Sequence, residues 1–289
     1  MQETTLSVGG LCLRLAGRDT LRLFGCLPGM RPFFVSSRVA DMRLQFDSEV
    51  PMPECRWLHS FDIADGASVC RFGIDADGVY YYTFDADTCL RFDARRPDTV
   101  ECTAVVDASL LRFVVWVAYS MMGLHRGALP VHSSVAVHDG HAVMCLGESG
   151  TGKSTHTRLW IEHIADTFLL NDDSPILSVA NGVPIVFGSP WSGKTPCYRA
   201  EQYPLAALLR LEQRPENSIR RLATVEAFTA LQPSCPPSMA KDERCLDLLV
   251  DFIAKVVKQV PVYRMGCLPN AEAARMSCGT IFSDDAGRQ

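Results

Sequence analysis

Paired cysteines, runs of basic residues, internal repeats and low-complexity tracts are all missing from this sequence of 289 residues. Its 12 cysteines stand singly between Cys12 and Cys278, with no Cys-x-x-Cys pair and no Cys/His cluster at zinc spacing. We therefore expect reduced thiols that act as small buried hydrophobes. The net charge of −5 comes without a Lys/Arg run, so the sequence predicts no nucleic-acid partner.

The sequence also lacks a long apolar run and the pattern of a secretory signal. Its most apolar stretch, residues 110–124, contains Arg112 and is shorter than the roughly 20 residues that cross a bilayer. The first residues, MQETTLSVGG, do not follow the basic-then-apolar order of a signal peptide. We expect a cytoplasmic protein with no membrane partner, and homo-oligomer formation is left open.

The first hundred residues show apolar and polar side chains in alternation, as in residues 11–15 and 69–74, which is typical of half-buried strands. Asp75-Ala76-Asp77-Gly78 separates two such stretches. It lacks the further ligands and the terminal Glu of a calcium loop, so it predicts a hairpin turn. Residues 1–105 are therefore expected to form an antiparallel β-rich N-terminal domain.

The apolar period becomes helical after Asp107, and no Pro or Gly interrupts residues 109–122. We expect an α/β domain over residues 106–289. Two strands are predicted before a glycine-rich loop, at residues 131–137 and 141–146. After the loop we expect two helices, at 205–212 and 246–257, and a further strand at 260–267.

The glycine-rich loop fits Gly-x-x-x-x-Gly-Lys-Ser/Thr in full, and it stands between an apolar strand and a helical run, the context that this motif requires. Its glycines allow backbone N–H groups to turn toward phosphate at the start of the helix. Lys153 is expected to reach the β/γ oxygens of ATP, and the Ser154 hydroxyl to bind Mg²⁺. The predicted nucleotide-binding residues are Gly147, Glu148, Ser149, Gly150, Thr151, Gly152, Lys153, Ser154 and Thr155.

A bound magnesium ion needs an anionic ligand, and Asp172 and Asp173 follow the next apolar strand. One aspartate is expected to bind the metal beside Ser154, with Asp172 as the candidate, while the other accepts a proton from an attacking hydroxyl; which of the two takes each role is left open. His132 stands at the start of a predicted strand, where a lone histidine is more often structural.

Three segments together resemble the catalytic domain of bacterial HPr kinase/phosphorylase and, more distantly, ATP-dependent phosphoenolpyruvate carboxykinase. They are Pro130-Val131-His132, residues 147–154 and Asn171-Asp172-Asp173. The resemblance implies a P-loop domain of that type, with Asp172, Asp173 and His132 as catalytic residues. Ser189-Pro190-Trp191-Ser192-Gly193 resembles a stretch common in HPr-kinase-like proteins, and Lys194 after it is implied to contact the transferred phosphoryl group or the substrate.

The resemblance covers residues 124–196 and has departures. Thr155 stands where the HPr kinases usually carry Glu, so HPr itself is not the expected acceptor. The function that we expect is transfer of the γ-phosphoryl group of ATP to a hydroxyl, with a small protein or peptide as one class of acceptor. A nucleotide-dependent regulatory module and a simple ATPase remain open as alternatives.

Overall fold

The computed structural model describes residues 2–36, 39–63, 68–193 and 195–285. Contacts divide the chain into two compact units. Unit 1 comprises Met1–Gly127 and Ser238–Leu248, and unit 2 comprises Ala128–Pro237 and Leu249–Gln289. The later boundary between them falls inside helix α4 (Glu243–Val257), so that helix contributes residues to both units.

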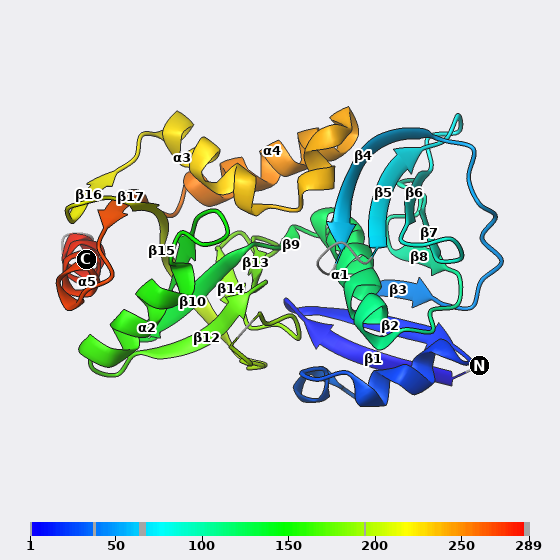
Figure 1. The fold of residues 1–289 in the computed structure, drawn as a ribbon, viewed down its shortest axis with the longest axis horizontal. Helices are drawn as coiled ribbons and strands as arrows, with labels where there is room; N and C mark the ends of the chain where they lie inside the picture. Colours follow the sequence, from blue (N-terminus) through cyan, green and yellow to red (C-terminus); the bar gives the residue numbers. More distant parts are fainter. Residues whose placement is uncertain (1, 37–38, 64–67, 194, 286–289) are drawn as a thin grey trace. The chain divides into compact units, whose positions relative to one another are not determined.

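Eight strands among the described residues of unit 1 form one mixed sheet in the order β1-β2-β3-β8-β7-β6-β5-β4 (Figure 1). The strands are β1 (Gln2–Val8), β2 (Leu11–Gly17), β3 (Met42–Gln45), β4 (Arg56–Ile63), β5 (Ser68–Ile74), β6 (Tyr80–Thr83), β7 (Cys89–Phe92) and β8 (Thr99–Cys102).

The prediction of a purely antiparallel sheet is wrong at β3, which pairs in parallel with both β2 and β8. Parallel neighbours need a long crossover connection, and the chain between β2 and β3 supplies one. It passes through the 3-10 helices η1 (Thr20–Cys26) and η2 (Arg31–Phe33) before β3 begins. The predicted hairpin around Asp75 is confirmed, because it joins the antiparallel strands β5 and β6.

Helix α1 (Ala108–Leu124) confirms the predicted helical run and packs on β3, β7 and β8. The Asp107 side chain caps it by accepting a hydrogen bond from Leu110 N at 2.7 Å. Contacts group α1 with unit 1, whereas the sequence placed it at the start of the second domain. An unbroken apolar run in the sequence indicates a buried helix, but it does not indicate which sheet that helix covers. The domain boundary between residues 105 and 106 stays a prediction.

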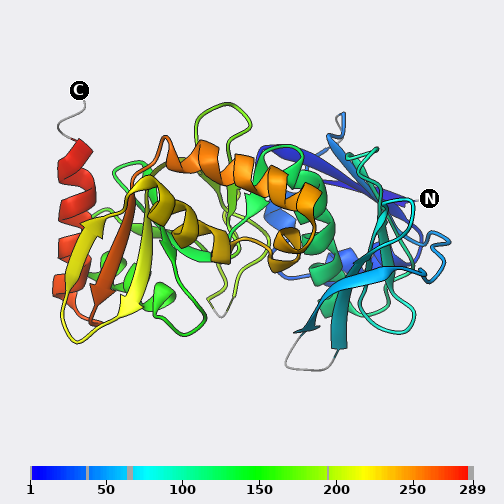
Figure 2. The ribbon, with the colours of Figure 1, turned by 90° about the horizontal axis from the view of Figure 1, so that it is seen from above.

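Nine strands among the described residues belong to the sheet of unit 2, with the path β12-β10-β11-β15-β14-β13-β9. Strand β17 pairs with β15 and β16, and Figure 2 shows these three side by side. The strands are β9 (Ala128–Pro130), β10 (Ser133–His138), β11 (His141–Leu146), β12 (Phe168–Asp173), β13 (Ile176–Ser178), β14 (Ile185–Phe187), β15 (Gln202–Gln213), β16 (Ser218–Arg221) and β17 (Val262–Cys267).

Two helices cover one face of this sheet, α2 (Lys153–His163) and α5 (Ala271–Asp285). Their apolar side chains share a buried cluster with alternate residues of β15, Leu209 and Leu211 among them. Arg210, between those leucines, donates instead to the Ala230 carbonyl of α3 (Thr224–Leu231). The shorter segments are η3 (Gln232–Ser234) and η4 (Pro237–Lys241).

The predicted helix at residues 205–212 is wrong, because this run lies in the long strand β15. The strand is paired in parallel with β11 on one side and β17 on the other, so apolar side chains are needed on both of its faces. A continuous leucine and alanine run does not distinguish such a strand from a buried helix. The predicted strand at residues 260–267 and helix at 246–257 are confirmed by β17 and α4.

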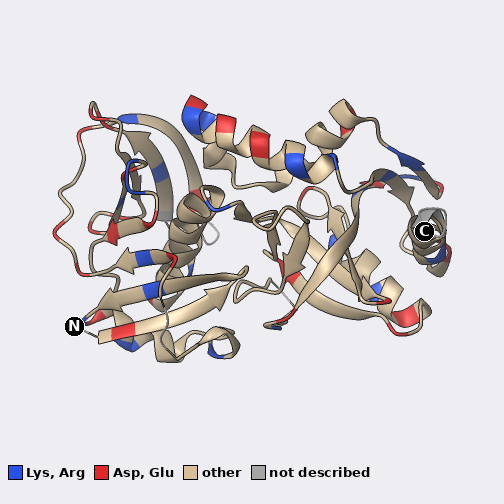
Figure 3. Ribbon diagram, turned by 180° about the vertical axis from the view of Figure 1, so that it is seen from behind, with Lys and Arg blue, Asp and Glu red and all other residues tan. Residues whose placement is uncertain are grey.

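Helix α4 carries both acidic and basic residues along its length, as Figure 3 shows, and buries apolar side chains such as Leu249 and Phe252. It is amphipathic, as a helix that lies on a core requires. Within the described part of the chain, we find no helix whose length and apolar character would allow it to cross a membrane.

Candidate functional site

The predicted site residues of unit 2 meet at one edge of its sheet. Strand β10 lies between β11 and β12 and is antiparallel to both, so its first residue is at the level where its two neighbours end. Ser133 pairs with Leu146 on one side and with Asp173 on the other. The glycine-rich loop, the aspartate pair and the residue before β10 are therefore neighbours in space.

The loop that follows β11 requires glycine at several positions. Gly147, Gly150 and Gly152 all have positive φ, at 154°, 82° and 100°. A Cβ at Gly147 would collide with the Thr151 hydroxyl, whose oxygen donates to the Glu148 carbonyl at 2.7 Å. Gly152 is the residue before α2, so the loop leads directly into the positive end of that helix.

Lys153 is buried, and its ammonium group lies inside the loop. It donates to the carbonyl oxygens of Gly147 at 2.9 Å and Glu148 at 3.2 Å. Burial lowers the pKa of Lys153 from its ordinary value, while Asp173, Asp172 and Glu148 act in the opposite direction. An ammonium group has three N–H donors, so one remains for a phosphate oxygen beyond the two that hold the loop.

Ser154 and Asp172 are in direct contact at the first turn of α2. The Ser154 hydroxyl donates to Asp172 Oδ1 at 2.8 Å, although the two residues belong to different elements. Asp172 is buried, with 5% of its surface exposed. A hydroxyl and a carboxylate oxygen are the hard ligands that Mg²⁺ prefers, so this pair fits a magnesium site shared with phosphate oxygens.

Asp173 points to a different partner. Its Oδ1 lies 3.9 Å from Nε2 of His132, and both side chains are half exposed. Partial burial and the charge of Lys153 lower the pKa of His132, against an opposite effect of Asp173. His132 thus favours the neutral form at pH 7. The φ of Asp173 is 136°, a strained value for a residue with a side chain, and such strain often accompanies functional sites.

The Ser-Pro-Trp-Ser-Gly segment lies against the aspartate pair. Gly193 N donates to the Asp172 carbonyl at 2.6 Å, and the backbone of Ser192 forms an isolated antiparallel β-bridge with that of Asp173. A Cβ at Gly193 would come within 3.2 Å of the Cβ of Asp173, so glycine permits this close approach. Lys194, which the resemblance implied at the site, lies outside the described residues.

Two contributions from β15 were missed by sequence reasoning. Arg210 makes an ion pair with Glu148 of the loop at 2.7 Å, and Gln213 donates to the Gly150 carbonyl at 3.1 Å. Both residues lie in the carboxyl half of β15, where the sequence predicted a helix at residues 205–212. The charge of Arg210 within an apolar run was the one signal that this segment approaches a polar site.

A cavity of about 340 Å³ lies between these groups. Its lining combines the loop, the start of α2, the aspartate pair and the residues at the start of β10: His132, Ser133, Ser149, Gly150, Gly152, Lys153, Ser154, Thr155, Asp172, Asp173 and Gly193. The cavity therefore joins a cationic, N–H-rich side to an acidic side. Among the described residues, no group of three or more His, Cys, Asp or Glu side chains could hold a metal ion by itself.

No model of a known protein family matches the chain, and no curated protein matches its sequence. Among solved structures, it is similar to the Hpr(Ser) kinase/phosphatase from Coxiella burnetii, at 14% sequence identity and a TM-score of 0.31. That alignment covers 55% of this chain and 97% of the other. The likeness is a distant structural relation, and the function proposed below rests on the side chains of the site.

Proposed function

We propose that this chain is an ATP- and Mg²⁺-dependent phosphotransferase that transfers the γ-phosphoryl group to a hydroxyl. The acceptor class that we favour is Ser or Thr of a small protein or peptide. The observation that carries the proposal is the separation of the two aspartates: Asp172 contacts Ser154 at 2.8 Å, whereas Asp173 lies beside His132. Adjacent carboxylates with different partners suit the two tasks of such a reaction, metal binding and proton acceptance.

The residues of the loop suit a bound triphosphate. Positive charge comes from Lys153 and from the N-terminus of α2, and the glycines leave backbone N–H groups free of side-chain obstruction. Ser154 and Asp172 would hold Mg²⁺ together with phosphate oxygens, which accords with the small number of protein ligands that Mg²⁺ takes in such sites. Bound there, the ion would neutralise charge on the β and γ phosphates.

Transfer would require one proton acceptor beside the γ phosphate, and Asp173 meets that need. The acceptor hydroxyl oxygen forms a bond to the γ phosphorus, the bond from that phosphorus to the bridging oxygen breaks, and ADP leaves. The hydroxyl proton goes to the Asp173 carboxylate, which His132 keeps in position. Lys153 stabilises the charge on the phosphate oxygens throughout.

The proposal is tested by incubating the purified protein with γ-labelled ATP, Mg²⁺ and a library of hydroxyl-bearing proteins and peptides. We expect label in one class of acceptor, and transfer about 10²–10⁴-fold slower with Asp173→Asn. Label released only as inorganic phosphate would replace transfer by ATP hydrolysis. ATP binding with neither transfer nor hydrolysis would identify a nucleotide-dependent regulatory module instead.

A further inference from the structure

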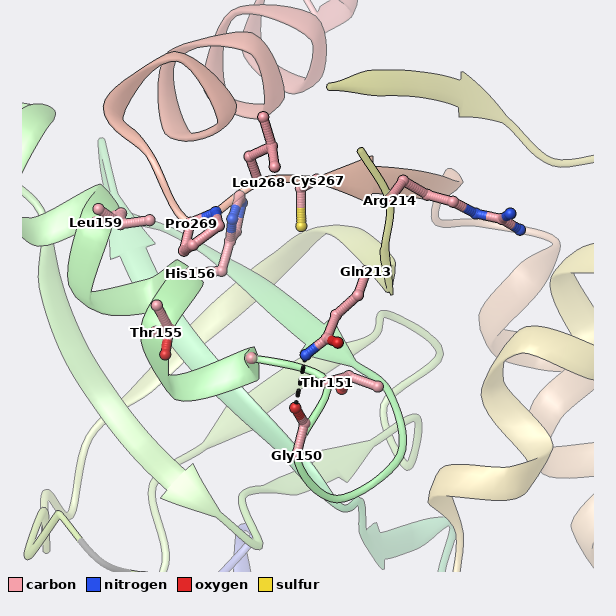
Figure 4. A pocket seen from close by; sticks show the side chains of 11 residues that line it. Gly150, Thr151, Thr155, His156, Leu159, Gln213, Arg214, Cys267, Leu268 and Pro269 are labelled. Carbon is pink, nitrogen blue, oxygen red and sulfur yellow. Dashed lines mark hydrogen bonds between the residues drawn. The ribbon is translucent and has the colours of Figure 1, made fainter. Parts of the chain in front are cut away.

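A second cavity, of about 480 Å³, adjoins the first within unit 2 (Figure 4). Gly150, Gly152 and Thr155 line both cavities, so the loop and the first turn of α2 form their common wall. The remaining walls come from the ends of β15 and β17 and from one further turn of α2. A molecule bound across the loop could therefore occupy both spaces at once.

This second cavity lies at the carboxyl edge of three parallel strands. Strand β15 is parallel to both β11 and β17, and the loops that follow all three strands contribute to the lining. Ligands of open α/β sheets bind in the crevice at this edge, where loops rather than paired backbone meet the ligand. The position is that of a ligand site built by the same sheet that positions the glycine-rich loop.

The lining of the second cavity differs from that of the first in having no Asp or Glu. Leu159, Leu268 and Pro269 provide apolar surface, and Figure 4 shows the Gln213 side chain directed toward Gly150. His156 is buried, and its Nε2 lies 3.0 Å from the Ser277 hydroxyl oxygen. Arg214 also belongs to the lining, but its guanidinium is paired with Glu212 at 2.9 Å and is directed away from the other lining side chains in Figure 4. A pocket that combines apolar surface with neutral polar side chains suits an uncharged, flat organic group better than a metal.

We propose that the second cavity binds the nucleoside part of the nucleotide whose phosphates occupy the loop. This inference rests on the proposed function and extends it. The γ phosphate must lie on the side of Asp172 and Asp173, where the metal ligand and proton acceptor are. The α phosphate and the nucleoside then leave the loop on its other side, past Thr155, where the second cavity opens.

Leu268 offers a direct way to fill this cavity without disturbing the core. Leu268 is 37% exposed, and its hydrogen bonds are made by its backbone: the N–H donates to Asn217 Oδ1, and the carbonyl accepts from Asn270 N. A Leu268→Trp variant would occupy the space of the nucleoside. Val225→Trp is the matched control, because Val225 is 78% exposed on α3 and lines neither cavity.

The two variants and Lys153→Met are titrated with ATP and with tripolyphosphate, each in the presence of Mg²⁺. Tripolyphosphate carries the phosphate chain without the nucleoside. We expect Leu268→Trp to weaken ATP binding by at least about tenfold, which corresponds to loss of one good contact, and to leave tripolyphosphate binding unchanged. Lys153→Met should weaken both ligands, and Val225→Trp neither.

Unchanged ATP affinity in Leu268→Trp, with both ligands weakened in Lys153→Met, would overturn the nucleoside pocket and leave the proposed function standing. Unchanged affinities in Lys153→Met would instead overturn the proposed function. An increased KM for the hydroxyl acceptor in Leu268→Trp, with normal ATP affinity, would assign the cavity to the acceptor and also contradict the inference.

Protection of Cys267 from alkylation gives a second readout on the wild-type protein, which does not depend on the folding of any variant. The Cys267 thiol lines the cavity and is half-buried, whereas Cys26 is exposed in unit 1 and serves as the internal control. We expect ATP, but not tripolyphosphate, to slow the reaction of Cys267 with iodoacetamide, measured by mass spectrometry. Equal protection by both ligands, or by neither, would overturn the inference.

Discussion

The turn aspartates of unit 1 and the aspartate pair of unit 2 serve different purposes. In unit 1, Asp75, Asp85 and Asp93 each accept hydrogen bonds from backbone N–H groups only two to four residues further along the chain. These contacts close turns between neighbouring strands. The carboxylates are held by their own loops.

In unit 2, Asp172 and Asp173 have partners that are distant in the sequence. Asp172 accepts a hydrogen bond from Ser154, 18 residues earlier, and Asp173 lies beside His132, the residue that precedes β10. The pairing of strands in the sheet, and not a local turn, places these two carboxylates beside their partners. Distance along the chain does not identify a site acid by itself, because Asp47 of unit 1 also accepts from distant residues, Arg18 N and the Thr20 hydroxyl. The site acids differ in lying at a strand end beside the glycine-rich loop.

The largest effect that this comparison predicts is on turnover. Asp173→Asn keeps the shape of the side chain but removes its basicity, so transfer should fall by about 10²–10⁴-fold, the usual contribution of general base catalysis. Mg²⁺-ATP binding should persist in this variant, measured by titration calorimetry. Asp172→Asn is the matched variant and should instead weaken binding in a Mg²⁺-dependent way. Identical behaviour of the two variants would remove the division of roles.

A buried histidine beside the site should make stability depend on pH. His156 is 2% exposed and bonded to Ser277 at 3.0 Å, and its pKa falls from 6.5 to about 4 on folding. As pH drops from 6.5 toward 4, the unfolded chain binds a proton that the folded protein does not, so stability decreases. Each pKa unit corresponds to about 1.4 kcal/mol, which gives a loss of about 3 kcal/mol.

Urea unfolding at pH 7 and pH 4.5 measures this loss in the wild type and in His156→Gln. The variant lacks the titrating group and should show a smaller difference between the two pH values. An equal pH dependence in both proteins would show that His156 does not control acid stability.

His132→Gln should lower turnover by about 10–100-fold, the usual effect of losing a group that positions a catalytic side chain. The stability cost should be small, because half of the His132 side chain is exposed. An activity assay and a thermal melt on the same preparation separate the two roles. A large loss of melting temperature with full activity per folded molecule would make His132 structural.

The smallest effect concerns a turn of unit 1. Asp75→Ala removes the acceptor for Asp77 N and Val79 N, both at 2.9 Å, and should lower the free energy of unfolding by about 1 kcal/mol. ATP affinity should be unchanged. Asp77→Ala in the same turn is the control, because its side chain accepts neither bond. Loss of ATP binding in Asp75→Ala would break the distinction between turn acids and site acids.

Much of the site could be predicted from sequence because its signals are local. The spacing of Gly147, Gly152 and Lys153, with a strand before and a helix after, determines the loop, and the resemblance added His132. The positions of Arg210 and Gln213 could not be predicted, since an apolar run buried on both faces looks alike in a helix and a central strand. Parallel pairing of β3 was missed for a related reason: it depends on the path of a crossover that carries no short motif.

Titration calorimetry of Mg²⁺-ATP into wild type and Lys153→Met determines whether the glycine-rich loop binds the phosphates of a magnesium nucleotide. Methionine keeps the buried stem of Lys153 and removes only the ammonium group. Loss of charge-assisted hydrogen bonds predicts affinity about 10–100-fold weaker, with an unchanged melting curve showing that the fold is intact. Equal affinity in the two proteins would contradict the account.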